Sequence, residues 1–154
     1  MAQTKTSEKD KAMRTIIVAS IFLCMASLTF AQAADSAEEQ KPKTFKMEQG
    51  DTTYVMQKYF MVFLKSGPAR SQTKEEAEKI QKKHLAYLQK MAEEGNTSIT
   101  GPMGDAGEIR GIVIYNTATA EQARMLAEGD PAVKAGRLVV EVHPWWAAKG
   151  SKLK

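Results

Sequence analysis

Residues 54–68 have the sequence YVMQKYFMVFLKSGP, and they decide the fold. The stretch is rich in aromatic and β-branched residues as far as Leu64, and Ser66-Gly67-Pro68 then ends it, which predicts a β-strand that begins near Thr53. Both faces of this strand are apolar, because Phe60, Val62 and Leu64 alternate with Tyr59, Met61 and Phe63. A sheet that contains such a strand must be covered on both of its faces.

A helix is predicted directly after this strand. Thr73 and Glu76 have the spacing of a capping box at its start, and Gly95 is expected to end it. Apolar residues then recur every three or four positions, so that one face of the helix points inward. That face comprises Ala77, Ile80, His84, Leu88 and Met91. A histidine therefore occupies a position where core residues point.

Two short strands are expected next, over residues 98–100 and 110–115. Ile112, Val113 and Ile114 make the second of them apolar on both faces, as in the first strand of the domain. Gly101-Pro102 lacks the repeated glycines of a phosphate-binding loop, and it is predicted to form a turn between the two.

The last third of the chain contains a second helix and a final strand. Thr119 and Gln122 have the spacing of a second capping box. Pro131 prevents a simple continuation of the helix that they open, and a helical turn over residues 132–135 is expected beyond it. The final strand is predicted over residues 138–143, with Pro144-Trp145-Trp146 closing the domain.

The predicted order of elements is βαββαβ, which is the ferredoxin-like α+β arrangement with an antiparallel sheet. Right-handed crossovers place both helices on one face of that sheet. The opposite face is also apolar, and no other segment of the chain is available to cover it. We therefore expect an obligate homodimer in which two sheets pack face to face.

The first 33 residues resemble a secretory signal peptide. Basic residues precede an apolar run over residues 16–30, and Ala31-Gln32-Ala33 places small residues where a signal peptidase cleaves. The run is short for a transmembrane helix of about 20 residues, although an uncleaved anchor is the alternative. We expect a periplasmic or secreted protein with no membrane attachment after cleavage, a flexible lead-in over residues 34–52, a domain over 53–148 and a tail over 149–154.

Composition excludes several classes of function for the exported domain. Cys24 is the single cysteine and lies within the predicted signal peptide, so disulfides and thiol chemistry are excluded beyond it. The formal net charge of +4 belongs partly to the same segment. No basic stripe with interleaved aromatic residues remains, which argues against a nucleic-acid partner.

Several motifs in the predicted order resemble those of the YCII-related (YciI-like) family. They are His84-Leu85, Gly101-Pro102-Met103, Asp130-Pro131 with Ala135-Gly136, and the closing His143-Pro144-Trp145. The resemblance extends from Tyr59 to Trp146. It implies a ferredoxin-like fold related to the muconolactone-isomerase-type dimeric α/β barrels, and an active-site histidine–aspartate pair that corresponds by position to His84 and Asp130.

The chemistry of such a pair is plausible in its own right. Asp130 lies at a predicted helix end, where a carboxylate is electrostatically unfavourable. A carboxylate beside an imidazole favours its charged form and fixes which ring nitrogen carries the proton. The alternative is structural, with His84 a hydrogen-bonded core residue and Asp130 a cap of the turn that follows Pro131.

Other candidate residues are weaker. Tyr59, Gly101, Pro102 and His143 are the expected substrate contacts. By strand alternation, His143 lies on the face away from the helices. A metal site built from both histidines and Asp130 has no supporting ligand spacing, so no metal and no cofactor are expected.

Two classes of function remain open on this basis. A histidine–aspartate pair without a cofactor can move protons but cannot accept hydride, which favours isomerase or lyase chemistry on a small cyclic or carbonyl-containing molecule. The alternative is a non-catalytic homodimer, ligand-binding or structural, in which the same pair orders the pocket wall. A cavity of roughly a few hundred Å³ that reaches His84 favours the enzyme, and a filled core favours the alternative.

Overall fold

The computed structural model describes residues 41–153, so the predicted signal peptide lies outside it. The elements in chain order are β1 (Thr44–Gln49), β2 (Thr52–Ser66), α2 (Lys74–Glu93), β3 (Thr97–Pro102), β4 (Ile109–Tyr115), α3 (Ala120–Glu128), α4 (Pro131–Lys134) and β5 (Leu138–Ala148). Among these residues, no helix combines the length and the apolar character that crossing a bilayer requires.

The sheet is antiparallel throughout and is organised around the long strand β2. One edge of β2 pairs with β5, and the other edge pairs first with β1 and then with β4, which in turn pairs with β3. Without β1, the order in space is β5-β2-β4-β3, and the order in the chain is βαββαβ. The predicted ferredoxin-like α+β fold is confirmed.

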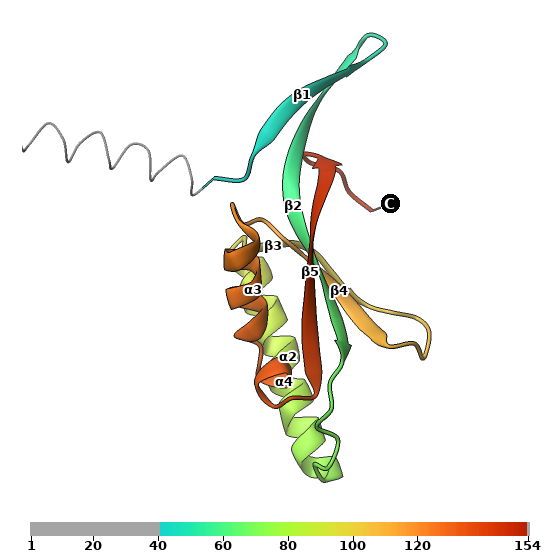
Figure 1. The fold of residues 1–154 in the computed structure, drawn as a ribbon, viewed down its shortest axis with the longest axis vertical. Helices are drawn as coiled ribbons and strands as arrows, with labels where there is room; N and C mark the ends of the chain where they lie inside the picture. Colours follow the sequence, from blue (N-terminus) through green and yellow to red (C-terminus); the bar gives the residue numbers. More distant parts are fainter. Residues whose placement is uncertain (1–40, 154) are drawn as a thin grey trace, which may run out of the picture. The chain divides into compact units, whose positions relative to one another are not determined.

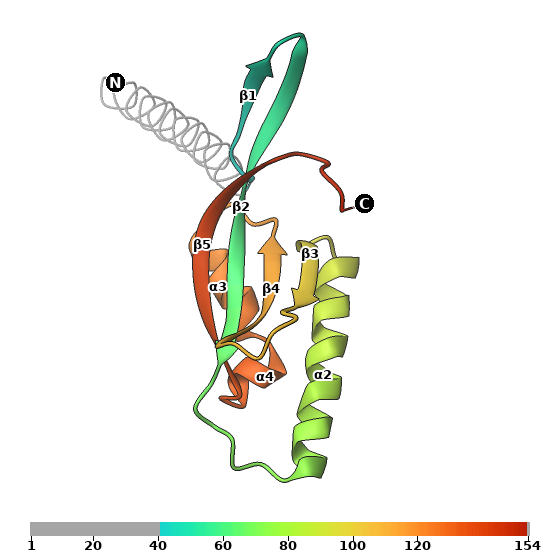
Figure 2. The same cartoon turned by 90° about the vertical axis from the view of Figure 1, so that its right-hand side faces the viewer.

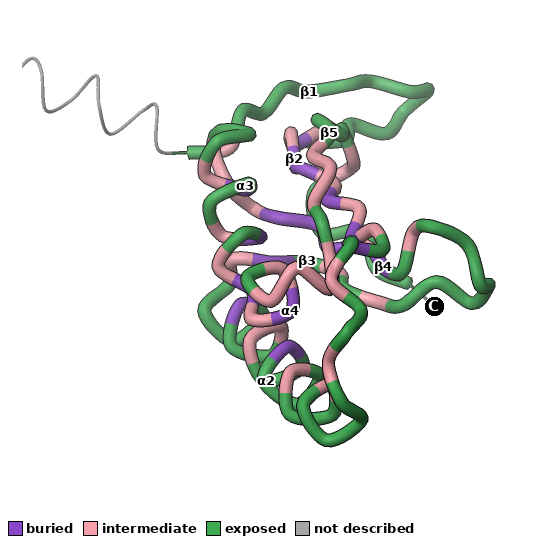
Figure 3. Tube along the Cα trace, turned by 60° about the horizontal axis from the view of Figure 1, so that its bottom comes forward, coloured by how far each residue is buried: buried purple, intermediate pink, exposed green. Residues whose placement is uncertain are grey.

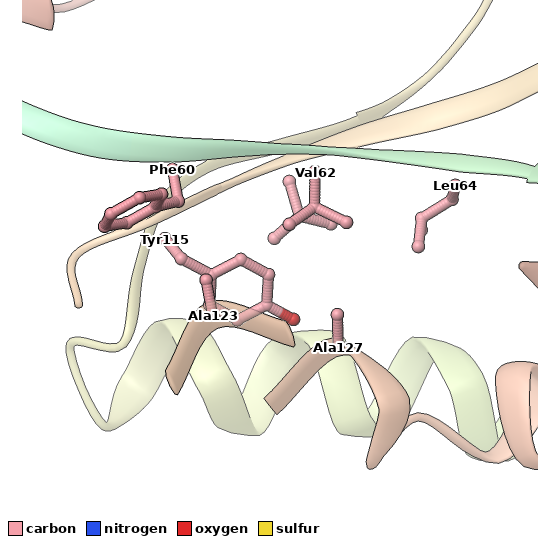
Figure 4. Close-up of a cluster of buried hydrophobic side chains, with 7 residues drawn as sticks. Phe60, Val62, Leu64, Tyr115, Ala123 and Ala127 are labelled. Atoms are coloured by element: carbon pink, nitrogen blue, oxygen red, sulfur yellow. The ribbon is translucent and has the colours of Figure 1, made fainter. Parts of the chain in front are cut away.

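All three helices lie on the same face of the sheet (Figures 1 and 2). The core fills the space between them and β2. Figure 4 shows Phe60, Val62 and Leu64 pointing from β2 toward α3, where Ala123 and Ala127 face them. Small alanines on the helix let it approach the sheet closely, and the Tyr115 ring from β4 fills the remaining space.

Both helices begin as their capping residues predict. The Thr73 hydroxyl accepts from the Glu76 amide at 3.2 Å, and the Glu76 carboxylate accepts from the Thr73 amide at 2.8 Å, which completes a capping box. At α3, Thr119 accepts from the Gln122 amide, but the Gln122 side chain accepts from the Ala118 amide instead of closing the box. Beyond α2, Gly95 adopts a φ of 74° that L-residues rarely tolerate.

The prediction of a flexible lead-in up to residue 52 is wrong for its last part. Thr44–Gln49 form β1, which pairs along its length with the start of β2. This hairpin carries almost no buried surface, and β1 is exposed from end to end (Figure 3). Its apolar side chains find a local partner instead, since the Phe45 and Trp146 rings pack edge to face with centroids 4.9 Å apart. The mixed polar sequence of this segment does not indicate a strand, because its stability comes from pairing with β2.

Two prolines that were expected outside the strands belong to them. Gly101-Pro102 forms the end of β3, paired with Ile112 and Gly111, and does not form the predicted turn. Pro144 lies within β5, which continues to Ala148. β3 and β5 each pair along one edge only, and an edge strand tolerates proline because the missing amide faces away from the ladder.

Candidate active site

His84 lies on the inner side of α2, as its helical spacing predicts. It is one of two buried residues of this helix, with 8% of its surface exposed. The other is Met91, two turns further along the same face. The imidazole is therefore held between the helix and the rest of the domain.

Asp130 lies in the tight connection between α3 and α4 and is 2% exposed. Its backbone carbonyl accepts from the Lys134 amide at 2.9 Å, and its Oδ1 accepts from the Ala132 amide at 2.7 Å. Asp130 is thus the N-cap of α4, with Pro131 at the first helical position. The capping role proposed as the structural alternative is present.

The second carboxylate oxygen of Asp130 meets the histidine. His84 Nδ1–H donates to Asp130 Oδ2 at 2.6 Å, within the buried interior. Because the oxygens of a carboxylate only accept hydrogen bonds, the ring proton of this contact is placed on Nδ1. In the neutral imidazole, Nε2 then carries the free lone pair. One aspartate performs both roles, with one oxygen for each.

Two tyrosines surround the pair and remain protonated. Burial raises the pKa of Tyr87, and the negative charges of Asp130 and Glu94 add to the effect. Burial also raises the pKa of Tyr115, followed by the influence of Tyr87 and of Asp130. The Tyr87 hydroxyl donates to the Leu126 carbonyl at 2.7 Å and so ties α2 to α3 beside the pair.

A cavity of about 570 Å³ opens at His84, between α2, the ends of the strands and α4. Among the described residues, every side-chain nitrogen or oxygen that is sealed from solvent has a hydrogen-bond partner. His84 Nε2 has none in this part of the chain, so it keeps accessible surface at the cavity wall. The lining residues include Leu64, Gln81, His84, Leu88, Thr100, Gly101, Pro102 and Leu138. A basic nitrogen that is oriented by a carboxylate therefore faces a space of the size that small-molecule sites have.

The sequence model of the YCII-related domain family matches residues 59–146, which is more than half of the chain. The chain belongs to this family. The resemblance drawn from its motifs is thereby confirmed, and the matched residues extend from Tyr59 in β2 to Trp146 in β5.

Among solved structures, this YCII-related domain is similar to 5-chloro-2-hydroxyhydroquinone dehydrochlorinase (TftG) from Burkholderia phenoliruptrix AC1100, in complex with 2,5-dihydroxybenzoquinone. The two sequences are 22% identical, and the similarity covers 56% of this chain and 92% of that chain with a TM-score of 0.44. The comparison with curated proteins found no match.

Two of the four expected substrate-contact residues lie at the same cavity as His84 in this YCII-related domain. Gly101 and Pro102 line the cavity. Tyr59 and His143 do not, because they lie on the opposite face of the sheet. Strand alternation explains this, since Phe60, Val62 and Leu64 face the helices while Tyr59 pairs with Trp145, and Met61 with His143, on the other side.

His143 belongs to a second cluster on that open face. Its Nε2 is 2.7 Å from Glu141 Oε1, and Lys65 donates to Glu141 Oε2 at 3.0 Å. Hydrogen bonds from Lys65 and then from His143 lower the pKa of Glu141. Hydrogen bonds to Glu141 and Glu108 raise the pKa of Lys65. Within residues 41–153, no three histidine, cysteine, aspartate or glutamate side chains gather in a way that could hold a metal ion.

Three arginines that no sequence motif marks also line the cavity. Arg70 lies in the loop after β2, Arg110 lies in β4, and Arg137 lies directly before β5. They are separated in sequence and share no motif. The available signal was weak, namely that each arginine lies close to a terminus of a predicted strand, at the same end of the sheet.

Proposed function

We propose that this YCII-related domain is an enzyme that moves protons with His84 and Asp130, of isomerase or lyase type, on a small cyclic or carbonyl-containing molecule. The observation that carries the proposal is the 2.6 Å contact between His84 Nδ1 and Asp130 Oδ2, with Nε2 at a cavity of about 570 Å³. The pair needs no cofactor for such chemistry, because proton transfer leaves the oxidation state of the enzyme unchanged.

The proposed reaction begins at a carbon–hydrogen bond next to a carbonyl. His84 Nε2 removes the proton, and the electron pair of that bond moves into the carbonyl to form an enolate. Asp130 stabilises the imidazolium that forms. The same proton is then returned to another carbon in an isomerisation, or to a departing group in an elimination. General acid–base catalysis of this kind contributes roughly 10²–10⁴-fold in rate.

The experiment is exchange of carbon-bound hydrogen for deuterium. Small cyclic ketones and lactones are incubated with the protein in D₂O, and loss of the proton next to the carbonyl is followed by NMR. We expect exchange with the natural chain and a decrease of about 10²-fold or more with His84→Ala. His143→Ala is the matched control and should exchange normally, because His143 lies on the other face of the sheet.

The second candidate is a non-catalytic homodimer, ligand-binding or structural, in which the pair orders the cavity wall. The cap that Asp130 Oδ1 provides to Ala132 favours it, since this contact alone would keep an aspartate at the position. Equal exchange by the natural chain and by His84→Ala would favour this candidate over the enzyme.

We also propose that the protein is a homodimer joined through the open face of the sheet. Met61, Phe63 and Ile112 point to that face and are half-buried, and Val139 and Trp145 are more than a third exposed there. Apolar side chains left partly exposed on this face, around the Lys65–Glu141–His143 cluster, favour contact with a second copy of the chain. Sedimentation should give twice the monomer mass, and a stable monomer at micromolar concentration would contradict the proposal.

Export is a further proposal, and it rests on residues outside the described range. The apolar run and Ala31-Gln32-Ala33 support cleavage after Ala33 and a periplasmic or secreted location. The N-terminal sequence of exported material tests this, and material that begins at Met1 would contradict it.

A further inference from the structure

The cavity beside His84 has a strongly unbalanced charge. Arg70, Arg110 and Arg137 line it, and no aspartate or glutamate is among its lining residues. Within residues 41–153, none of the three guanidinium groups forms a salt bridge, whereas Lys65, Lys90 and Arg124 do. Three cations around one cavity without carboxylate partners repel one another, and an anion placed between them would remove that repulsion.

Each guanidinium is nevertheless held in place, and by a neutral oxygen. Arg70 Nε donates to the Gly67 carbonyl at 3.3 Å, Arg110 donates to the Gly107 carbonyl at 3.2 Å, and Arg137 donates to Gln72 Oε1 at 2.8 Å. A guanidinium has five N–H donors. Each arginine is therefore oriented by one hydrogen bond while most of its donors, and its whole charge, remain available.

The backbone joins two of these arginines into one rim. The Gly67 amide donates to the Arg137 carbonyl at 2.8 Å, and the Ala69 amide donates to the Gly136 carbonyl at 3.0 Å. A Cβ atom on Gly67 would lie 2.3 Å from the Gly136 oxygen, so this close approach requires glycine. The loop that carries Arg70 and the turn that carries Arg137 are thereby fixed to each other.

The third arginine is placed by a β-bulge. Leu64 pairs with Gly111, but the next residue of β2 pairs with Ile109, so Arg110 is the extra residue of β4. Bulges redirect side chains out of the regular alternation of a strand. This bulge accounts for an arginine at the cavity wall close to the helix-covered face.

We propose that the cavity binds small molecules that carry a carboxylate, with the three arginines holding the carboxylate and His84 Nε2 meeting the remainder of the molecule. Guanidinium groups bind carboxylates through paired, charge-assisted hydrogen bonds. This inference rests on the proposed function for the role of His84 but not for the anion site itself. If both proposals hold, the substrate is a carboxylic acid whose reacting carbon lies a short distance from its carboxylate.

The test compares acids with their neutral counterparts. Benzoate, phthalate, maleate and succinate are titrated into the natural full-length chain by calorimetry and NMR, beside the corresponding amides. We expect the acids to bind, the amides to bind much more weakly, and Arg110→Gln or Arg137→Gln to weaken the acids by roughly tenfold or more. Arg124→Gln is the matched control and should bind normally, because Arg124 lies on α3 away from the cavity and pairs with Glu128.

The outcomes separate this inference from the proposed function. Equal binding of acids and amides, no binding of any of the four acids, or an equal loss with Arg124→Gln would overturn the anion site. Acid binding that persists in His84→Ala, without any hydrogen exchange by the natural chain, would support the anion site and reject the enzyme. Hydrogen exchange by the natural chain, together with equal binding of acids and amides, would support the enzyme and reject the anion site.

Discussion

The two faces of the sheet each hold a histidine–carboxylate pair, and the two pairs have nearly the same length. His84 lies 2.6 Å from Asp130 on the face that the helices cover, and His143 lies 2.7 Å from Glu141 on the open face. The side chains of the first pair are 10% and 2% exposed, whereas those of the second are 48% and 45% exposed. Their surroundings differ more than their geometry does.

The difference shows that a short histidine–carboxylate distance is not sufficient to identify an active site. Asp130 is fixed by the helix it caps, and it uses its second oxygen for the histidine. Glu141 accepts hydrogen bonds from both Lys65 and His143 in a cluster that is solvent-exposed in the single chain, where interactions of this kind are weak. Only the buried pair presents a free ring nitrogen to a cavity, and this property distinguishes a candidate base from a surface contact.

The largest expected effect is on stability. Asp130→Ala removes the partner of His84 and the cap of α4 together, and we expect the free energy of unfolding to fall by about 3–5 kcal/mol. Asp130→Asn retains a capping oxygen and should lose less. Glu141→Ala should lower the urea unfolding midpoint much less, because the Glu141 side chain is 45% exposed in the single chain. Equal losses of unfolding free energy from Asp130→Ala and Glu141→Ala would contradict the proposed difference between the two pairs.

The second prediction concerns what covers the open face. Met61→Glu places a charge beside His143 at the proposed interface, and we expect the dissociation constant of the dimer to rise by roughly 100-fold. Met125→Glu makes the same change on the outer surface of α3, where Met125 is 63% exposed, and should leave the dimer intact. Sedimentation measures both, with circular dichroism to establish that each variant is folded. A Met61→Glu variant that is folded and fully dimeric would contradict the interface.

The third prediction uses alkaline pH to probe the surroundings of the buried pair. In the unfolded chain a tyrosine ionises near its ordinary pKa of about 10, whereas burial raises the pKa of Tyr115 in the folded protein. The stability that this group contributes is therefore present below pH 10 and is lost as pH rises above it, by at most about 1.4 kcal/mol per pH unit. The free energy of unfolding, measured with urea at several pH values above 10, should fall less steeply with pH for Tyr115→Phe than for the natural chain. Tyr54→Phe, on the exposed hairpin, should keep the natural slope.

Local sequence patterns were sufficient to predict most of the fold and the central pair. Thr73 with Glu76 located the start of α2, and helical spacing turned His84 inward, because both depend on residues within one or two turns of each other. Asp130 was found through its place before Pro131 and through the family motifs. Strand alternation was equally informative about which residues of β2 share a face.

Features that depend on long-range pairing could not be predicted. β1 is stabilised by its pairing with β2 and by the contact of Phe45 with Trp146, neither of which appears in its own composition. Pro102 belongs to β3 and not to a turn because it pairs with Gly111 of β4. The arginines of the cavity come from three separate segments, and a bulge determines the place of Arg110. No local window contains that information.

The close approach of Gly67 to Gly136 has a consequence for the order of folding. It joins the end of the first strand of the βαββαβ domain to the residues just before the last strand, and nearby Arg137 donates to Gln72 across 65 residues of sequence. Contacts of such long range form late, because closing the intervening loop costs entropy that only subsequent packing returns. A growing chain that has not yet added Gly136 and Arg137 therefore lacks this part of the cavity rim. We therefore expect the proposed ligand to bind only after Gly136 and Arg137 have been synthesised.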